Sequence, residues 1–253
     1  MRLNRILLGL ALSVGFVLAA WIGAPAFAQT RDVKIVAADG RRVALVIGNT
    51  QYRYVTPLAN PKNDARAIAD SLKKLGFDVD VGLDLTKAQM QETVRRFGTR
   101  LEGAQAAVFY YSGHGLQING ANYLAAVDTK IASDKDIEYE VLDVSQVLRQ
   151  MEADKRVNLV FLDACRNNPF AETLQRSIKV GTRAISIGSG LAPVDAAAGT
   201  LISYATKDGT VASDGVGDHS PFTRALLAEM STPGLEVGLM LRCGVTQKFT
   251  FVE

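Results

Sequence analysis

The chain has 253 residues, of which 48% are apolar and 21% charged, which suits one globular domain with a substantial core. It contains 28 basic and 26 acidic side chains and no basic block with interleaved aromatic residues, which argues against a nucleic-acid partner. Two cysteines are too few for a scaffold stapled by disulfides.

The first 28 residues have the organisation of a secretory signal peptide. Arg2 and Arg5 give a positive start, residues 6–20 are apolar and uncharged, and Ala26-Phe27-Ala28 has the form of a cleavage site. We therefore expect cleavage after Ala28 and export to the periplasm or the medium. The alternative is an uncleaved membrane anchor, because the apolar run is fairly long. Loss of Arg2 and Arg5 reduces the 28 basic residues to 26, which equals the 26 acidic ones.

The first unit after the leader is a strand followed by a helix. Residues 43–47 form a continuous apolar run, as in a strand of a parallel sheet that is buried on both faces. A helix with apolar residues at helical spacing is expected to begin at a cap on Asn63 or Asp64. It ends near Leu75, before Gly76.

The same alternation continues along the chain. The further expected elements are strand 77–81, helix 86–101, strand 106–111, helix 144–151, strand 157–162, strand 200–204 and helix 220–230. This order predicts an α/β fold, a three-layer sandwich with a mostly parallel central sheet. Residues 167–199 lack clear periodicity and are rich in Gly, Ala and Ser, so we expect a long loop there.

Two polar turns after buried strands carry reactive side chains. His114 follows the strand 106–111 and Cys165 follows the strand 157–162. Sites in parallel sheets form beyond the carboxyl ends of the strands, so neighbouring strands would bring the two residues to the same edge. A thiol is mostly protonated at neutral pH and needs an imidazole beside it as general base.

The surroundings of this pair suit acyl transfer. The amides of Gly115 and Cys165 can hold the oxyanion of a tetrahedral intermediate. The alternatives are a buried structural cysteine, a structural histidine, or a disulfide between Cys165 and Cys243. His219 and Cys243 are the other residues of these two types, but neither ends a buried strand, so the pattern favours His114 and Cys165.

The motifs Tyr110–Gly115 and Leu162–Arg166 resemble the histidine and cysteine motifs of the caspase-like clan of cysteine peptidases. That clan includes caspases, paracaspases, metacaspases and bacterial relatives. The spacing of the motifs is also similar to that of caspases, in which the histidine lies about 50 residues upstream of the cysteine. The resemblance covers residues 41–235 and implies a caspase-like fold, a Cys-His dyad and a protein or peptide substrate.

The residues around Cys165 differ from those of caspases proper. Caspases have glutamine two places before the cysteine and glycine two places after it, whereas Asp163 and Asn167 stand here. Asp163 resembles the metacaspase and paracaspase pattern. There the aspartate lines the S1 pocket, which holds the residue before the cleaved bond (P1), and selects arginine or lysine.

The resemblance to paracaspases makes Asp64 a second acidic residue of the S1 pocket. Buried carboxylates are costly unless they meet a cation, so a basic P1 side chain is their natural partner. Asp208 and Asp214 are both candidates to complete the pocket. The alternatives are a hydrogen-bonding role for Asp163 and a helix cap for Asp64.

The N-terminal pattern and the resemblance together divide the chain into four parts. These are a signal peptide (1–28), a linker (29–40), a caspase-like peptidase domain (41–235) and a C-terminal tail (236–253), which is either a final strand or a truncated end. The loop 167–199 corresponds to the place where caspases are cut between subunits. It contains Arg176, Lys179 and Arg183, so self-cleavage is a hypothesis beside that of a plain surface loop.

No cofactor and no metal site are expected. Many metacaspases need calcium, but no acidic cluster here marks a site, so calcium dependence stays open. We expect no nucleic-acid partner and no membrane span after leader cleavage, and dimerisation is not carried over from caspases. The competing function is a catalytically silent scaffold or interaction module. An esterase is disfavoured because no G-x-S-x-G nucleophile elbow occurs.

Overall fold

The computed structural model describes residues 40–153, 155–164, 168–180, 186–188, 190–194, 197–205, 214–215, 217–244 and 249–252. The chain divides into the units 1–35 and 36–253, and all described residues belong to the second. The predicted signal peptide and Cys165 lie outside the described residues, and the predicted domain boundaries stay predictions. Within the described part, no helix combines the length and the apolar character that a membrane span requires.

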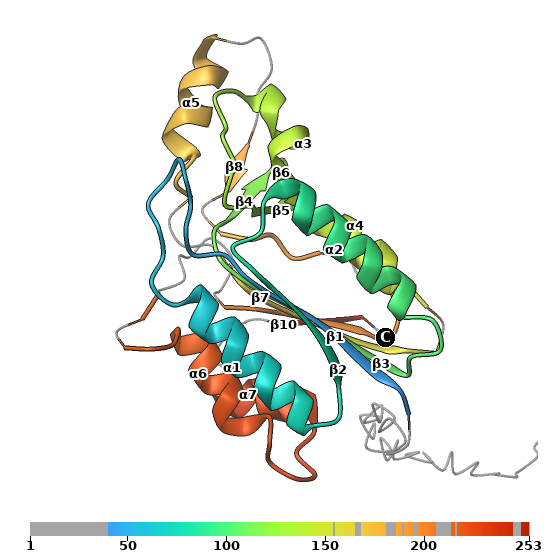
Figure 1. Ribbon diagram of the computed structural model, residues 1–253. Helices are drawn as coiled ribbons and strands as arrows, with labels where there is room; N and C mark the ends of the chain where they lie inside the picture. The colour runs from blue at the N-terminus through green and yellow to red at the C-terminus, as the bar shows by residue number, and fades with distance from the viewer. Residues whose placement is uncertain are drawn as a thin grey trace, which may run out of the picture. The chain divides into compact units, whose positions relative to one another are not determined.

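A six-stranded sheet, in the order β10-β9-β7-β3-β1-β2, forms the centre of the described unit (Figure 1). Its strands are β1 (Arg42–Gly48), β2 (Asp78–Leu83), β3 (Ala106–Ser112), β7 (Val157–Asp163), β9 (Thr200–Tyr204) and β10 (Phe249–Val252). All neighbours pair in parallel except β10, which is antiparallel to β9. The predicted α/β fold with a mostly parallel sheet is confirmed.

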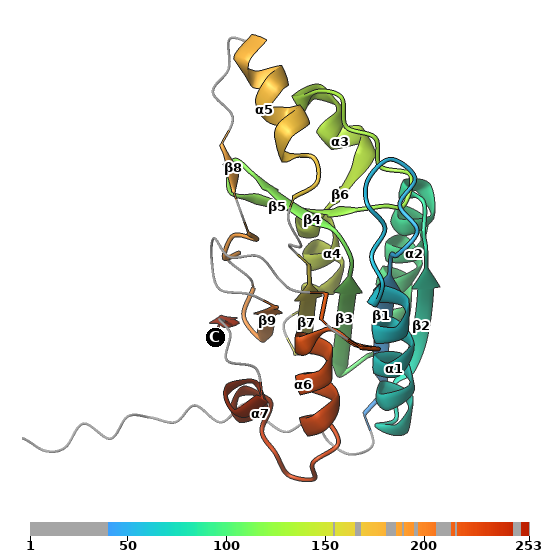
Figure 2. The same ribbon diagram turned by 90° about the vertical axis from the view of Figure 1, so that its left-hand side faces the viewer.

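Helices cover both faces of this sheet (Figure 2). One face carries α1 (Pro61–Lys74), α6 (Pro221–Glu229) and α7 (Val237–Gly244), and the other carries α2 (Lys87–Arg100) and α4 (Val144–Met151). Along β1, side chains alternate between two apolar clusters, one beneath each layer of helices. The continuous apolar runs of the sequence therefore correspond to strands buried on both sides.

A second, smaller sheet lies beyond the carboxyl ends of the central strands (Figure 2). It has the order β6-β5-β4-β8, with β4 (Gly115–Ile118), β5 (Ala121–Ala125), β6 (Val141–Asp143) and β8 (Ile187–Gly188). The 3-10 turn Asp134–Asp136, α3 (Ile137–Glu140) and α5 (Ala171–Val180) accompany it. The prediction of one long loop over 167–199 is wrong in part, because α5 and β8 fall within it. Phe170 and Leu174 anchor α5 by packing against Ile131 and Ile137.

The start of α1 also differs from the prediction. The helix begins at Pro61 with Asn60 as its N-cap, so the cap predicted at Asn63 or Asp64 is wrong. Proline fits the first helical position because its missing N–H needs no partner there. Asp64 consequently lies inside the first turn, where its side chain is fully buried. The predicted start of α6 is confirmed, with Ser220 as cap before Pro221.

A buried arginine joins the start of β7 to the ends of two helices. The guanidinium of Arg156 donates to the carbonyl oxygens of Leu101 (3.1 Å) and Met151 (2.5 Å) and to Oδ1 of Asn158 (2.9 Å). Substitution by methionine keeps an unbranched apolar stem but leaves these buried acceptors without their donor.

We expect Arg156→Met to lower the free energy of unfolding by about 2–4 kcal/mol, because buried acceptors without partners destabilise the native state. Urea unfolding followed by circular dichroism measures the change. Arg95→Met is the control, because Arg95 pairs with Glu92 on the exposed surface of α2. Its midpoint should equal that of the parent chain, and an equal midpoint for Arg156→Met would contradict the prediction.

Candidate active site

The carboxyl ends of β3 and β7 meet at one edge of the central sheet, with Ser112 opposite Asp163. The amide of Gly113 donates to the carbonyl oxygen of Asp163 (3.2 Å). A Cβ atom added to Gly115 would lie 3.0 Å from that of Ala164. The turn that carries His114 thus lies against the described segment that ends at Ala164. Cys165 follows that segment but lies outside the described residues. That it lies close to His114 therefore stays a prediction.

His114 is buried, with 4% of its surface exposed, and is held at its backbone and its ring. Its amide donates to the hydroxyl of Tyr52 (2.8 Å), and its carbonyl accepts from the hydroxyl of Tyr111 (2.8 Å). Nε2 lies 2.9 Å from the carbonyl oxygen of Thr56. Because a carbonyl only accepts, Nε2 carries the proton, and the lone pair of the neutral ring is on Nδ1.

Two tyrosines build the support beneath His114. Their hydroxyls lie 3.3 Å apart, and the ring of Tyr52 is tilted against the imidazole with 4.5 Å between the centroids. Tyr52 comes from the segment after β1, and Tyr111 comes from β3. A Cβ on Gly113 would lie 2.5 Å from both hydroxyl oxygens, so only glycine fits between them.

Asp163 is fully buried at the end of β7. Its Oδ2 accepts from the hydroxyls of Ser220 (2.5 Å), Thr223 (3.1 Å) and Tyr110 (3.5 Å). Ser220 and Thr223 belong to the start of α6, so this carboxylate faces the positive end of a helix dipole.

Asp64 is the second fully buried carboxylate. Its Oδ1 lies 3.0 Å from Nδ1 of His219 and accepts from the amide of Ser220 (3.2 Å). Its Oδ2 accepts from the hydroxyl of Ser112 (3.4 Å). Ser220 therefore bonds to both acidic residues, through its amide to Asp64 and through its hydroxyl to Asp163.

The negative charges of these carboxylates affect the phenol of Tyr110. Its pKa is raised well above the ordinary value of 10.0, first by burial and then by the negative charges of Asp163 and Asp64. The phenol therefore stays protonated and remains a donor. Buried carboxylates favour a cation, and a guanidinium or an ammonium group is the ligand that suits them.

The sequence model of the caspase domain, peptidase family C14, matches residues 41–252. The chain belongs to this caspase-domain peptidase family. It is 33% identical over 148 residues to human mucosa-associated lymphoid tissue lymphoma translocation protein 1, which covers 58% of this chain and 17% of that protein. The mouse homologue is 32% identical over 135 residues, covering 53% of this chain and 16% of the homologue.

Mouse caspase-1 is 25% identical to this caspase-domain protein over 129 residues, which covers 49% of this chain and 31% of caspase-1. The chain thus spans less than a third of each of these three relatives. The resemblance to the caspase-like clan predicted from the two motifs is confirmed at the level of the family.

The other predicted residues of the caspase domain are only partly placed. Asp214 bonds to the segment before α1, through its Oδ2 to the amide of Ala59 (2.7 Å) and through its carbonyl to the side chain of Asn60 (2.5 Å). Asp208 lies outside the described residues. Gly115 is the first residue of β4, and the role of its amide as an oxyanion donor stays a prediction.

The predicted positions for self-cleavage and for a disulfide are largely outside the described part. Arg176 lies in α5, where its Nε donates to the carbonyl of Glu172 (3.3 Å), and the side chain of Lys179 and all of Arg183 are not described. Cys243 belongs to α7, but its side chain is likewise not described. Among the described residues, no three His, Cys, Asp or Glu side chains gather as a metal site.

Sequence reasoning missed three residues of the candidate site. Thr56 contributes a backbone carbonyl, which no side-chain pattern reveals. Tyr52 lies in the segment after β1, and its contact with His114 depends on the fold. His219 ends no buried strand, yet its Nδ1 lies 3.0 Å from Oδ1 of Asp64.

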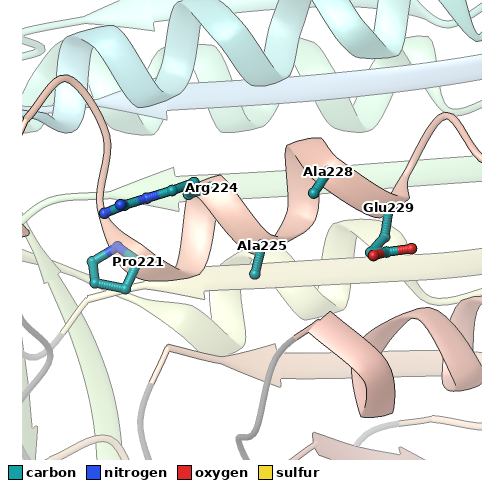
Figure 3. Close-up of a pocket in the computed structure, with 5 residues that line it drawn as sticks. All are labelled: Pro221, Arg224, Ala225, Ala228 and Glu229. Carbon is teal, nitrogen blue, oxygen red and sulfur yellow. The ribbon is translucent and has the colours of Figure 1, made fainter.

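An open pocket on the outer face of α6 is not an alternative active site (Figure 3). It is lined by Pro221, Arg224, Ala225, Ala228 and Glu229. These residues include neither a nucleophile nor a histidine, so they cannot supply the chemistry of a cysteine peptidase.

Proposed function

We propose that this protein is a cysteine endopeptidase that uses Cys165 as nucleophile and His114 as general base. The observation that carries the proposal is the contact between the two motifs. The turn around His114 bonds to Asp163 and lies against Ala164, the residue before Cys165. Membership of a peptidase family supports the same chemistry.

In the proposed mechanism, Nδ1 of His114 takes the proton of the Cys165 thiol, and the thiolate attacks the carbonyl carbon of the scissile peptide bond. The amides of Gly115 and Cys165 hold the resulting oxyanion. The protonated imidazole then gives its proton to the leaving amine, and the C–N bond breaks to leave a thioester. Water, deprotonated by His114, attacks the thioester, and the acid product and free thiol are released.

The contacts around His114 suit a residue that first accepts a proton as general base and then donates it as general acid. The bond from Nε2 to the carbonyl of Thr56 fixes the tautomer and becomes stronger when the ring is protonated. The tyrosine hydroxyls hold the backbone on either side of the ring. The imidazole therefore needs little rearrangement between its two roles.

We further propose cleavage after arginine or lysine, with Asp163 and Asp64 as the acidic residues of the S1 pocket. Two buried carboxylates near one edge of the sheet support this preference, because a basic side chain compensates their burial. The proposed setting is an exported protein that acts on proteins or peptides without a cofactor. A requirement for calcium is tested in the same assay.

The test is hydrolysis of fluorogenic peptides that end in Arg, Lys or Asp, under reducing conditions, with and without calcium. The parent chain should cleave the Arg or Lys peptides, and Cys165→Ala and His114→Ala should each lose at least about 1,000-fold in kcat/KM. Cys243→Ala is the matched control and should keep full activity. Turnover of none of the peptides by the parent chain would instead favour a silent scaffold.

A further inference from the structure

The segment before α6 covers the carboxylate of Asp64. Asp214 anchors this segment to the start of α1 through its bonds to Ala59 and Asn60. At its other end, Nδ1 of His219 lies 3.0 Å from Oδ1 of Asp64, and the amide of Ser220 lies 3.2 Å from the same oxygen. Residues far apart in the chain thus meet on one oxygen atom.

The burial of these residues shows the direction from which Asp64 is covered. The side chain of Asp64 is 0% exposed, whereas that of His219 is 30% exposed. Ser220 is fully buried. The Nδ1 edge of the imidazole therefore points at the buried carboxylate, while part of the same side chain is in solvent.

The backbone of His219 is held at its carbonyl, whereas its side chain is 30% exposed. The carbonyl of His219 accepts from Nη2 of Arg224 (3.4 Å) and lies against Gly215, where an added Cβ would be 2.8 Å away. Ser220 caps α6. Rotation about the side-chain bonds of His219 moves the ring off Asp64 and leaves the cap of α6 unchanged.

We propose that His219 closes the S1 pocket of the unliganded protein. Its ring N–H occupies the position on Asp64 that a guanidinium or ammonium group of P1 takes, and the ring leaves Asp64 when a basic P1 side chain binds. This inference rests on the proposed function. The amide of Ser220 stays on Asp64 in both states, because it belongs to the cap of α6.

The consequence is a selection against P1 side chains without a positive charge. A basic side chain replaces the ring N–H by a charged donor, so the carboxylate keeps its compensation. A neutral P1 side chain interacts with the carboxylate of Asp64 less favourably than the imidazole does, so the ring stays in place. A basic peptide binds more weakly because part of its binding free energy is used to move the ring of His219. Removal of the ring should therefore increase the affinity for that peptide.

The test measures the dissociation constant of a peptide with arginine at P1 and of its citrulline counterpart, in the Cys165→Ala background of the full chain. Adding His219→Ala should tighten the arginine peptide by about tenfold, since a hydrogen bond to a carboxylate no longer has to be broken. The citrulline peptide should tighten by less than the arginine peptide, because its neutral N–H groups are weaker donors to a carboxylate than a guanidinium. His219→Asn is the matched control, because its amide N–H can replace Nδ1–H, and it should stay within about twofold of its background.

Two results would overturn the inference, namely unchanged or weaker binding of the arginine peptide to the His219→Ala variant. If the background protein instead binds the arginine and citrulline peptides equally, the proposed P1 preference itself is wrong. The two failures are therefore distinguishable.

A second measurement covers the case in which His219→Ala does not fold. The chain contains two histidines, so ring nitrogen signals of the untagged Cys165→Ala protein are assigned by their loss in His219→Asn. Saturation with the arginine peptide should move the Nδ1 signal of His219 as its bond to Asp64 breaks. A signal that stays in place in the saturated complex would refute the proposed opening.

Discussion

An Asp163→Asn variant should lose cleavage after arginine and lysine, with kcat/KM falling by about 100-fold to 1,000-fold. The carboxylate is fully buried and is bonded by the hydroxyls of Ser220, Thr223 and Tyr110. Asparagine has nearly the same shape, and hydroxyls can turn to accept as well as donate, so the surrounding structure should be kept. What the variant removes is one negative charge at the proposed binding site of the P1 cation.

The decisive readout is the ratio of kcat/KM for matched arginine and citrulline substrates. This ratio should collapse in Asp163→Asn, because citrulline has the shape of arginine without its charge. Asp70→Asn is the control, since it makes the same change on the exposed surface of α1, where Asp70 pairs with Lys73. An Asp163→Asn enzyme that still prefers arginine as strongly as the parent would show that this carboxylate serves the fold alone.

The central layer of the fold was predictable because a strand that is buried on both faces has a continuous run of apolar residues. The runs in β1, β3 and residues 159–162 of β7 are continuous and apolar, and the structure buries nearly every residue of β1 and β3. Helix α2 was predictable from apolar residues on one side, and α6 from the serine and proline at its start. In these elements local preference and tertiary burial favour the same conformation.

The second sheet was not predictable for the opposite reason. Its strands are 2–5 residues long, too short for a recognisable alternation of apolar and polar residues. They are stabilised by their neighbours, as in the pairing of Gln117 with Gly188, which lie far apart in the chain. Contacts of this kind depend on the completed fold and have no local signature.

The candidate site divides along the same line. His114 was predictable because it follows a buried strand, where parallel sheets place their functional groups. Asp163 was predictable because its motif resembles that of metacaspases and paracaspases. The groups that orient the site residues were not predictable. They are the backbone carbonyl of Thr56, which contacts His114, and the ring of His219, which contacts Asp64. The sequence predicts which side chains carry the chemistry, whereas the fold determines which groups orient them.

The prediction that tests this orientation most directly concerns Gly113. An added methyl group would lie 2.5 Å from the hydroxyl oxygens of Tyr52 and Tyr111, which hold the amide and the carbonyl of His114. Either the tyrosines or the turn must move. A displacement of the catalytic base by about 1 Å can cost about 100-fold in rate, so we expect kcat of Gly113→Ala to fall by about that factor.

The effect should be larger on kcat than on peptide affinity. The carboxylate of Asp163 is held by the hydroxyls of Tyr110, Ser220 and Thr223, whereas Gly113 bonds to the backbone carbonyl of Asp163. Steady-state kinetics on an arginine peptide and urea unfolding of the same sample separate these possibilities. Gly120→Ala is the matched control: its φ of 81° strains an alanine, but no atom lies within 4 Å of the added methyl group. That variant should lose a little stability, about 1 kcal/mol, and keep its turnover. Full turnover by Gly113→Ala would mean that the tyrosine pair does not set the position of His114.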